Sequence, residues 1–218
     1  MPKRAMTKFW DISEPIEEST ATFPGDTPFS REWVARMEDG ASCNVSTIRM
    51  SVHVGTHCDS PLHFDVEGDD IASVSLEPYM GRCRVVEVQG AGDPSQIPAS
   101  ALTDELLEGV ERILFRTQAR HDHQRFDESF TAVGPEAAER LAAAGVRLVG
   151  IDTPSMDHAT CKDLHGHNVL YRAGIAILEN IDLSDVPVGE YELIALPLRI
   201  RGSDSSPVRA ILRELDRP

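Results

Sequence analysis

The sequence has few cysteines and no long apolar run. Its four cysteines, Cys43, Cys58, Cys83 and Cys161, stand far apart and form no C-x-x-C pair. This spacing argues against a zinc ribbon and against a disulfide-rich secreted domain. No apolar run approaches the roughly 18 residues of a transmembrane helix. The basic start, "MPKRAMTKFW", turns polar and acidic without the apolar centre of a signal peptide. We therefore expect a cytoplasmic protein.

Basic residues are also scarce. Lys and Arg number 21 against 36 Asp and Glu, so the formal net charge is −15. A field of this sign repels polyanions, and we expect neither a nucleic acid nor a membrane surface as the partner. A small molecule held in a pocket remains compatible with this charge, and much of it serves solubility.

No repeat, low-complexity tract or long Gly/Ser linker divides the chain, so residues 1–218 are expected to form a single domain. Short runs rich in Val, Ile and Leu with turn residues at their borders predict strands within 7–13, 44–52, 83–89, 112–117, 146–152, 174–180 and 191–200. Helices are predicted over 134–145, over 103–110 and in part of 161–174. The fold class is therefore mixed α/β with a large sheet component, and the order of the strands is not readable.

One short stretch, "VHVGTHCDSPLHFD" at 52–65, concentrates groups that bind metal ions. It holds three of the eight histidines, His53, His57 and His63, together with Asp59. Neutral imidazole and carboxylate oxygen are the donors that Zn²⁺ and Mn²⁺ accept. A lone histidine would more often be a surface or hydrogen-bonded core residue, but for this combination we favour a metal site.

The backbone must bend if these side chains are to meet. Gly55 and Pro61 disfavour a helix here, so the helical motif H-E-x-x-H does not apply. On a straight strand His53 and His57 would point to the same side but lie about 13 Å apart. Gly55 can supply the bend without strain. Cys58 points the other way and is expected to be a small buried residue.

Further candidates lie downstream, where the residues alone leave alternatives open. His165 and His167 occur in "DLHGHNVL", and Glu179 ends the apolar run "GIAILEN". A buried carboxylate needs a partner or a metal ion, whereas a Glu at the end of a strand can equally turn to solvent. His121 and His123 are expected to lie on the surface.

At this point the sequence resembles a known family. "HVGTHCDSPLHF" is similar to the signature His-x-Gly-Thr/Ala-His-x-Asp-x-Pro-x-His of the metal-dependent cyclase-like hydrolases. "GIDTPSMD" and the C-terminal "ELIALPL" and "SPVRA" resemble the bacterial kynurenine formamidase (arylformamidase) branch. The similarity extends from Phe9 to about Arg213. Two departures are Thr56, where many formamidases have Ala, and Cys161 before Lys162, where Ser is usual.

The resemblance implies a fold and a set of roles. The fold would be the cyclase-like swivelling β/β/α domain, as a homodimer. Two zinc ions per subunit are implied, with manganese as the alternative. The implied metal ligands are His53, His57, Asp59, His167 and Glu179, with Asp59 reaching both ions. His63 would be the proton donor and acceptor, and Phe23 would contact the substrate.

The implied reaction is the hydrolysis of N-formyl-L-kynurenine to L-kynurenine and formate, in tryptophan catabolism. Two alternatives remain open. One is hydrolysis of a cyclic amide such as isatin. The other is a metal-binding or ligand-binding module without turnover, which would not need His63 as an unliganded imidazole.

Overall fold

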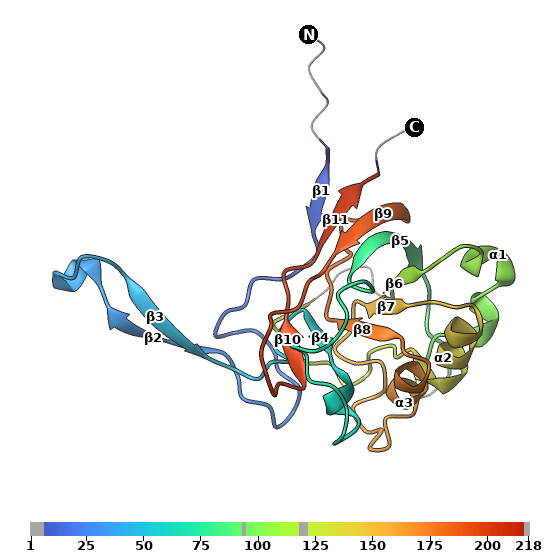
Figure 1. Cartoon of the computed structure of the whole chain (residues 1–218), viewed down its shortest axis with the longest axis horizontal. Helices are drawn as coiled ribbons and strands as arrows, with labels where there is room; N and C mark the ends of the chain where they lie inside the picture. The colour runs from blue at the N-terminus through green and yellow to red at the C-terminus, as the bar shows by residue number, and fades with distance from the viewer. Residues whose placement is uncertain (1–6, 93–94, 118–121, 216–218) are drawn as a thin grey trace, which may run out of the picture.

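The structure is a computed structural model that describes residues 7–92, 95–117 and 122–215 (Figure 1). Its strands are β1 (Phe9–Asp11), β2 (Ser30–Ala35), β3 (Val45–Arg49), β4 (His57–Asp59), β5 (Met80–Glu87), β6 (Arg112–Arg116), β7 (Leu148–Ile151), β8 (Ala176–Glu179), β9 (Gly189–Ile194), β10 (Ser205–Pro207) and β11 (Ile211–Glu214). Its α-helices are α1 (Asp104–Leu107), α2 (Gly134–Ala143) and α3 (His165–Arg172), and its 3₁₀ turns are η1 (Met37–Asp39), η2 (Pro61–His63) and η3 (Ala99–Ala101).

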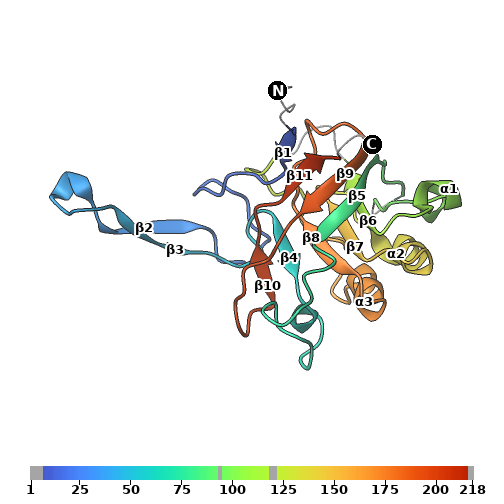
Figure 2. The same ribbon diagram turned by 45° about the horizontal axis from the view of Figure 1, so that its top comes forward.

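Nine of the strands in the described residues form one sheet in the order β1-β11-β9-β5-β6-β7-β8-β4-β10. Its centre, β5 to β8, is parallel, and the strands on both sides of this centre pair antiparallel. Parallel strands need crossover connections, and α1, α2 and α3 lie together on one side of the parallel strands (Figures 1 and 2). The prediction of a mixed α/β chain with a large sheet is confirmed.

Alternating side chains of the central strands serve two hydrophobic cores. In β6, Ile113 and Phe115 face the helices and pack in one cluster with Leu141 of α2 and Leu170 of α3. The intervening Leu114 faces the opposite side and packs in a second cluster. Because both faces of β6 are buried, its sequence is a continuous apolar run rather than an alternating one.

A two-stranded arm extends away from this body. β2 and β3 pair only with each other in the described sheets, and the ribbon projects into solvent in both views (Figures 1 and 2). Every residue of the two strands is exposed except Ala35, which is half-buried. The exposed side chains include large apolar ones: Trp33, Val34, Val45 and Ile48.

The described helices are short. None of them combines the length and the apolar character that crossing a membrane requires.

Candidate metal centre

The pairing of β4 with β8 brings three candidate ligands together. His57 lies opposite Glu179 in the antiparallel register, and Asp59 follows two residues later on the same face of β4. All three residues are buried, with His57 Nε2 3.1 Å from Glu179 Oε2 and 3.7 Å from Asp59 Oδ1. Cys58 points into the opposite core, as predicted.

His53 reaches the same point because the chain bends before β4. Gly55 has a φ of +69°, and a Cβ on it would lie 3.1 Å from Cγ1 of Ile16. This left-handed conformation favours glycine, and the bend predicted at Gly55 is present. The bend sets His53 Nδ1 3.3 Å from Asp59 Oδ1.

Helix α3 contributes His167, whose Nε2 lies 3.2 Å from Glu179 Oε1 and 4.0 Å from Asp59 Oδ2. The first residue of the helix, His165, is exposed and belongs to none of the candidate ligand groups of the described residues; its Nε2 lies 3.9 Å from Asp163. Of the two histidines that the sequence left open, the structure brings only His167 to Asp59 and Glu179.

The start of α3 is held by a carboxylate from another segment. Leu164, which precedes the helix, offers no side-chain cap. Asp157 accepts hydrogen bonds from the backbone N–H of Gly166 at 2.8 Å and of His167 at 2.9 Å, and from the Nδ1 of His167 at 2.7 Å. One side chain therefore satisfies the helix N-terminus and orients the imidazole.

Candidate ligand atoms form three groups in which they lie within 4.8 Å of one another. One group, partly buried, is His53, His63 and Asp204. The other two are more deeply buried: His53, His57 and Asp59, and Asp59, His167 and Glu179. Asp59 belongs to both of these. Nitrogen and carboxylate oxygen at this spacing are what a pair of divalent cations sharing one carboxylate requires.

The second ring nitrogen of each histidine in these groups is also engaged. His57 Nδ1 lies 2.9 Å from the carbonyl oxygen of Gly55, His167 Nδ1 contacts Asp157, and His53 Nε2 lies 2.9 Å from Asp204 Oδ2. An oxygen acceptor at one nitrogen leaves the lone pair at the other. Metal-binding histidines are oriented in this way.

The carboxylate of Asp59 shows most clearly that this site suits a cation. It is fully enclosed, and among the described residues neither of its oxygens receives a hydrogen bond. A buried carboxylate without such a partner costs several kcal/mol, on the order of an unpaired buried charge. Both carboxylate oxygens of Asp59 face imidazole nitrogens, at distances that leave room for an ion between them. The residues therefore fit a metal ion.

The pKa values of the site follow from this concentration of negative charge. Burial alone would lower the pKa of His53, but the carboxylates of Asp59 and Asp204 outweigh it and raise the pKa to about 9. Burial would also lower the pKa of His167, but the carboxylates of Asp157 and Glu179 outweigh this effect and raise the pKa to about 10. The carboxylates therefore require positive charge beside them, which protons on the imidazoles or a bound cation can provide.

His63 lies outside both of the more deeply buried groups. It ends η2, which starts with Pro61, and its side chain is 30% exposed. Its Nδ1 lies 3.1 Å from Asp204 Oδ2, and its ring centroid is 4.4 Å from that of His53. His63 shares the third candidate group with His53 and Asp204, so its place outside the ligand set stays a prediction.

A cavity of about 480 Å³ opens over these histidines. Phe23 lines it and makes an edge contact with Phe126 at 5.2 Å between ring centroids. The ring centroid of Phe130 lies 6.2 Å from that of Phe126. The expectation that His123 lies on the surface is wrong, because its side chain is partly buried and lines this cavity. His121 lies outside the described residues.

Sequence reasoning missed four residues of the site. Phe126 and Phe130 carry no signal except their aromatic character in a polar segment. Asp157 ends the stretch "GIDTPSMD", whose similarity was noted without a role for that residue. Asp204 lies in "RGSDSSP", a polar turn without any metal-site pattern.

Comparisons with known proteins agree with this geometry. The model of the Cyclase family, described as "Putative cyclase", matches residues 10–158. A curated protein named kynurenine formamidase, from Paracidovorax citrulli (strain AAC00-1), is 46% identical over 206 residues, which cover 94% of this chain and 95% of that protein. The chain belongs to the Cyclase family.

Solved structures share the fold. One, of a "potential metal-dependent hydrolase with cyclase activity", superposes with a TM-score of 0.80 at 28% identity and covers 97% of this chain and 100% of its own. Isatin hydrolase A from Labrenzia aggregata, bound to benzyl benzoate, has a TM-score of 0.76 at 20% identity over 96% of this chain and 94% of its own. The predicted cyclase-like fold is thereby confirmed.

Proposed function

We propose that this protein is a metal-dependent arylformamidase that hydrolyses N-formyl-L-kynurenine to L-kynurenine and formate. The observation that carries the proposal is the enclosed Asp59 carboxylate, which has no hydrogen bond among the described residues and is shared by two ligand groups. The other members of these groups line a cavity that three phenylalanines also line. The relative named kynurenine formamidase, at 46% identity over nearly the whole chain, supports this choice of substrate.

His53, His57 and Asp59 would hold one ion, and Asp59, His167 and Glu179 a second. We propose zinc at both positions, with manganese as the alternative, because imidazole nitrogen together with carboxylate oxygen suits these ions. A bound divalent cation supplies Lewis acidity, which polarises a carbonyl oxygen and lowers the pKa of water toward neutrality.

His63 would move the protons. Water adds to the formyl carbon, the bond from this carbon to the aniline nitrogen breaks, and the nitrogen needs a proton to leave as the amine. An imidazole suits this transfer near neutral pH. His63 lines the cavity and is partly exposed, and its contact with Asp204 is made through Nδ1, so its second nitrogen is available.

The aromatic side chains would hold the arene of the substrate. Phe23 and Phe126 meet edge to face on the cavity lining, and aromatic pairs of this kind offer a flat apolar surface to a further ring. Phe23 would orient the substrate without contacting the metal ligands.

We further propose that residues 1–218 form a single catalytic domain, because one sheet joins β1 to β11. We propose a homodimer as well. A two-stranded ribbon alone is marginally stable in water, and the arm of β2 and β3 displays Trp33, Val34 and Ile48 to solvent. A cytoplasmic location stays a prediction for cell fractionation to test.

The experiment that tests the substrate compares turnover of N-formylkynurenine and isatin by metal-loaded protein, with metal content measured on the same sample. We expect formamide hydrolysis with a much higher kcat/KM than ring opening of isatin. Preference for isatin would favour a cyclic-amide hydrolase instead. Stoichiometric metal without turnover of either compound would point to a binding module.

A further inference from the structure

Asp204 has a backbone position that does not depend on its own side chain. It directly precedes β10, whose first residue, Ser205, pairs with Asp59 of β4. The carbonyl oxygen of Asp204 accepts hydrogen bonds from the backbone N–H of Ser60 at 2.9 Å and from the Ser60 hydroxyl at 3.0 Å. Replacing the carboxylate therefore removes its contacts while the strand pairing and these backbone bonds remain.

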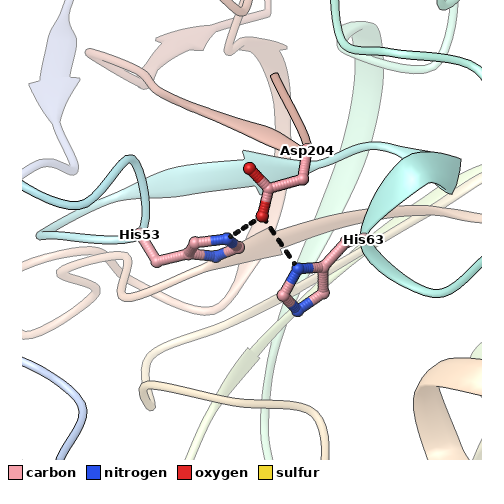
Figure 3. A group of neighbouring side chains, drawn as sticks. All are labelled: His53, His63 and Asp204. Atoms are coloured by element: carbon pink, nitrogen blue, oxygen red, sulfur yellow. Dashed lines mark hydrogen bonds and ion pairs between the residues drawn. The ribbon is translucent and has the colours of Figure 1, made fainter. Parts of the chain in front are cut away.

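A single oxygen of this carboxylate contacts two imidazoles. Oδ2 of Asp204 lies 2.9 Å from His53 Nε2 and 3.1 Å from His63 Nδ1 (Figure 3). An ionised carboxylate only accepts hydrogen bonds, so both of these nitrogens must carry a proton. When the rings are neutral, the lone pair of His53 is then at Nδ1, facing Asp59, and the lone pair of His63 is at Nε2.

The cavity borders the histidines rather than this carboxylate. Both His53 and His63 line it, whereas Asp204 is absent from the described residues that do. The Nε2 of His63 lies across the ring from the Asp204 contact (Figure 3). A molecule in the cavity can therefore meet His63 without meeting Asp204, and Asp204 acts through the histidine.

We propose that Asp204 is the positioning residue of the site, which fixes the tautomer and ring orientation of His63 and, through the same oxygen, holds His53 with Nδ1 toward Asp59. This inference rests on the proposed function of His63 in proton transfer. One carboxylate would thus align the proton-transfer group with one of the candidate metal ligands. Outer partners of this kind typically contribute about 10–100-fold to activity or to metal affinity.

The first test is independent of turnover. Nitrogen-15 NMR of zinc-loaded protein reports which ring nitrogen of His63 carries the proton. We expect Nδ1–H in the wild type and loss of this preference in Asp204→Ala. Asp69→Ala, which removes a carboxylate from an exposed position, serves as the control and should leave the tautomer unchanged. The same His63 tautomer in wild type and Asp204→Ala would overturn the proposal.

The second test is a double-mutant cycle in N-formylkynurenine hydrolysis, measured at saturating zinc with metal content checked for each protein. We expect Asp204→Ala to lower kcat by about 10–100-fold with little change in KM. In a His63→Ala background the same substitution should lower kcat by less than about twofold, because the proton-transfer group is gone and saturating zinc offsets the weaker hold on His53. If the fold-losses of kcat from the two single substitutions multiply in the double variant, Asp204 does not act through His63. Absence of turnover in the wild type would refute the proposed function, while the NMR result still decides the role of Asp204.

Discussion

At the scale of single residues, His57 and His63 occupy different electrostatic surroundings although only five residues separate them. The side chain of His57 is 2% exposed and lies between the carboxylates of Asp59 and Glu179. His63 is more exposed, and its Nδ1 contacts the carboxylate of Asp204. The first position suits a buried ligand, whereas the second lies on the cavity lining, where it can contact a bound molecule.

This difference predicts separable effects of two substitutions. His57→Ala should lose metal and activity together, because it removes a candidate ligand. His63→Ala should keep both ions and the fold but lose turnover by about 10²–10⁴-fold, the usual contribution of a positioned acid–base group. Metal analysis and kinetics on both purified variants provide the measurement. If the His63 variant loses its metal as readily as the His57 variant, His63 is a ligand and proton transfer belongs to another group.

The raised pKa values predict proton release on metal uptake. His53, with a pKa of about 9, and His167, with a pKa of about 10, carry protons near neutral pH in metal-free protein, and a metal ion must displace them. Zinc affinity should therefore rise with pH until the pH exceeds the pKa values of His53 and His167. Calorimetric titration with zinc in two buffers of different ionisation enthalpy should show about two protons released per subunit near neutral pH.

The exposed His165 provides the control for this titration, since His165→Ala should leave the proton count unchanged. Zinc binding near neutral pH that releases no protons would contradict the electrostatic account of the site.

At the scale of secondary structure, prediction succeeded where local sequence decides the outcome. α2 follows from Pro135 near its start and Gly145 after its end, and α1 begins at the Thr103 cap, which accepts a hydrogen bond from Leu106 N–H. β4 was missed because its three residues, His57–Asp59, are too few for a periodic pattern. Its conformation depends on pairing with β8 and β10, which come far later in the chain.

The start of α3 links an element to the site and gives a prediction. Asp157→Ala leaves the N–H groups of Gly166 and His167 without their acceptor and frees the ring of His167. We expect unfolding free energy to fall by about 1–3 kcal/mol, the penalty for buried donors left unpaired. Zinc affinity should fall by about 10–100-fold. Denaturant unfolding and competition with a chelator measure the two effects.

The neighbouring Asp163→Ala is the matched control for Asp157→Ala, since Asp163 is exposed and holds Asn168 through its backbone oxygen. An Asp157→Ala variant with unchanged zinc affinity would show that this carboxylate does not orient His167.

At the scale of the whole molecule, the site is assembled from segments that the sequence separates widely. The histidine cluster of 53–63 could be recognised because its members are close in the chain. His167 and Glu179 were assigned through family resemblance, and Asp204, 141 residues after His63, gave no signal. Such long-range partners depend on strand order, here β8-β4-β10, which composition and periodicity do not determine.

The arm of β2 and β3 gives a prediction about assembly. If its apolar side chains pack against a second copy, Ile48→Asp should shift the protein from dimer toward monomer, because a buried charge without a partner opposes association. Sedimentation velocity over a concentration series provides the measurement. Val66→Asp, at an 88% exposed apolar residue outside the arm, is the control and should not change the mass. A wild-type protein that is monomeric at all concentrations would contradict the dimer.

The central claim is that hydrolysis depends on metal held by His53, His57, Asp59, His167 and Glu179, and removal and return of the metal test it most directly. Purified protein is treated with a strong chelator, dialysed and assayed for both metal content and N-formylkynurenine hydrolysis, before and after addition of zinc or manganese. We expect loss of activity in step with loss of metal, and recovery as up to two ions per subunit return. Full activity in protein shown to be metal-free would contradict the central claim.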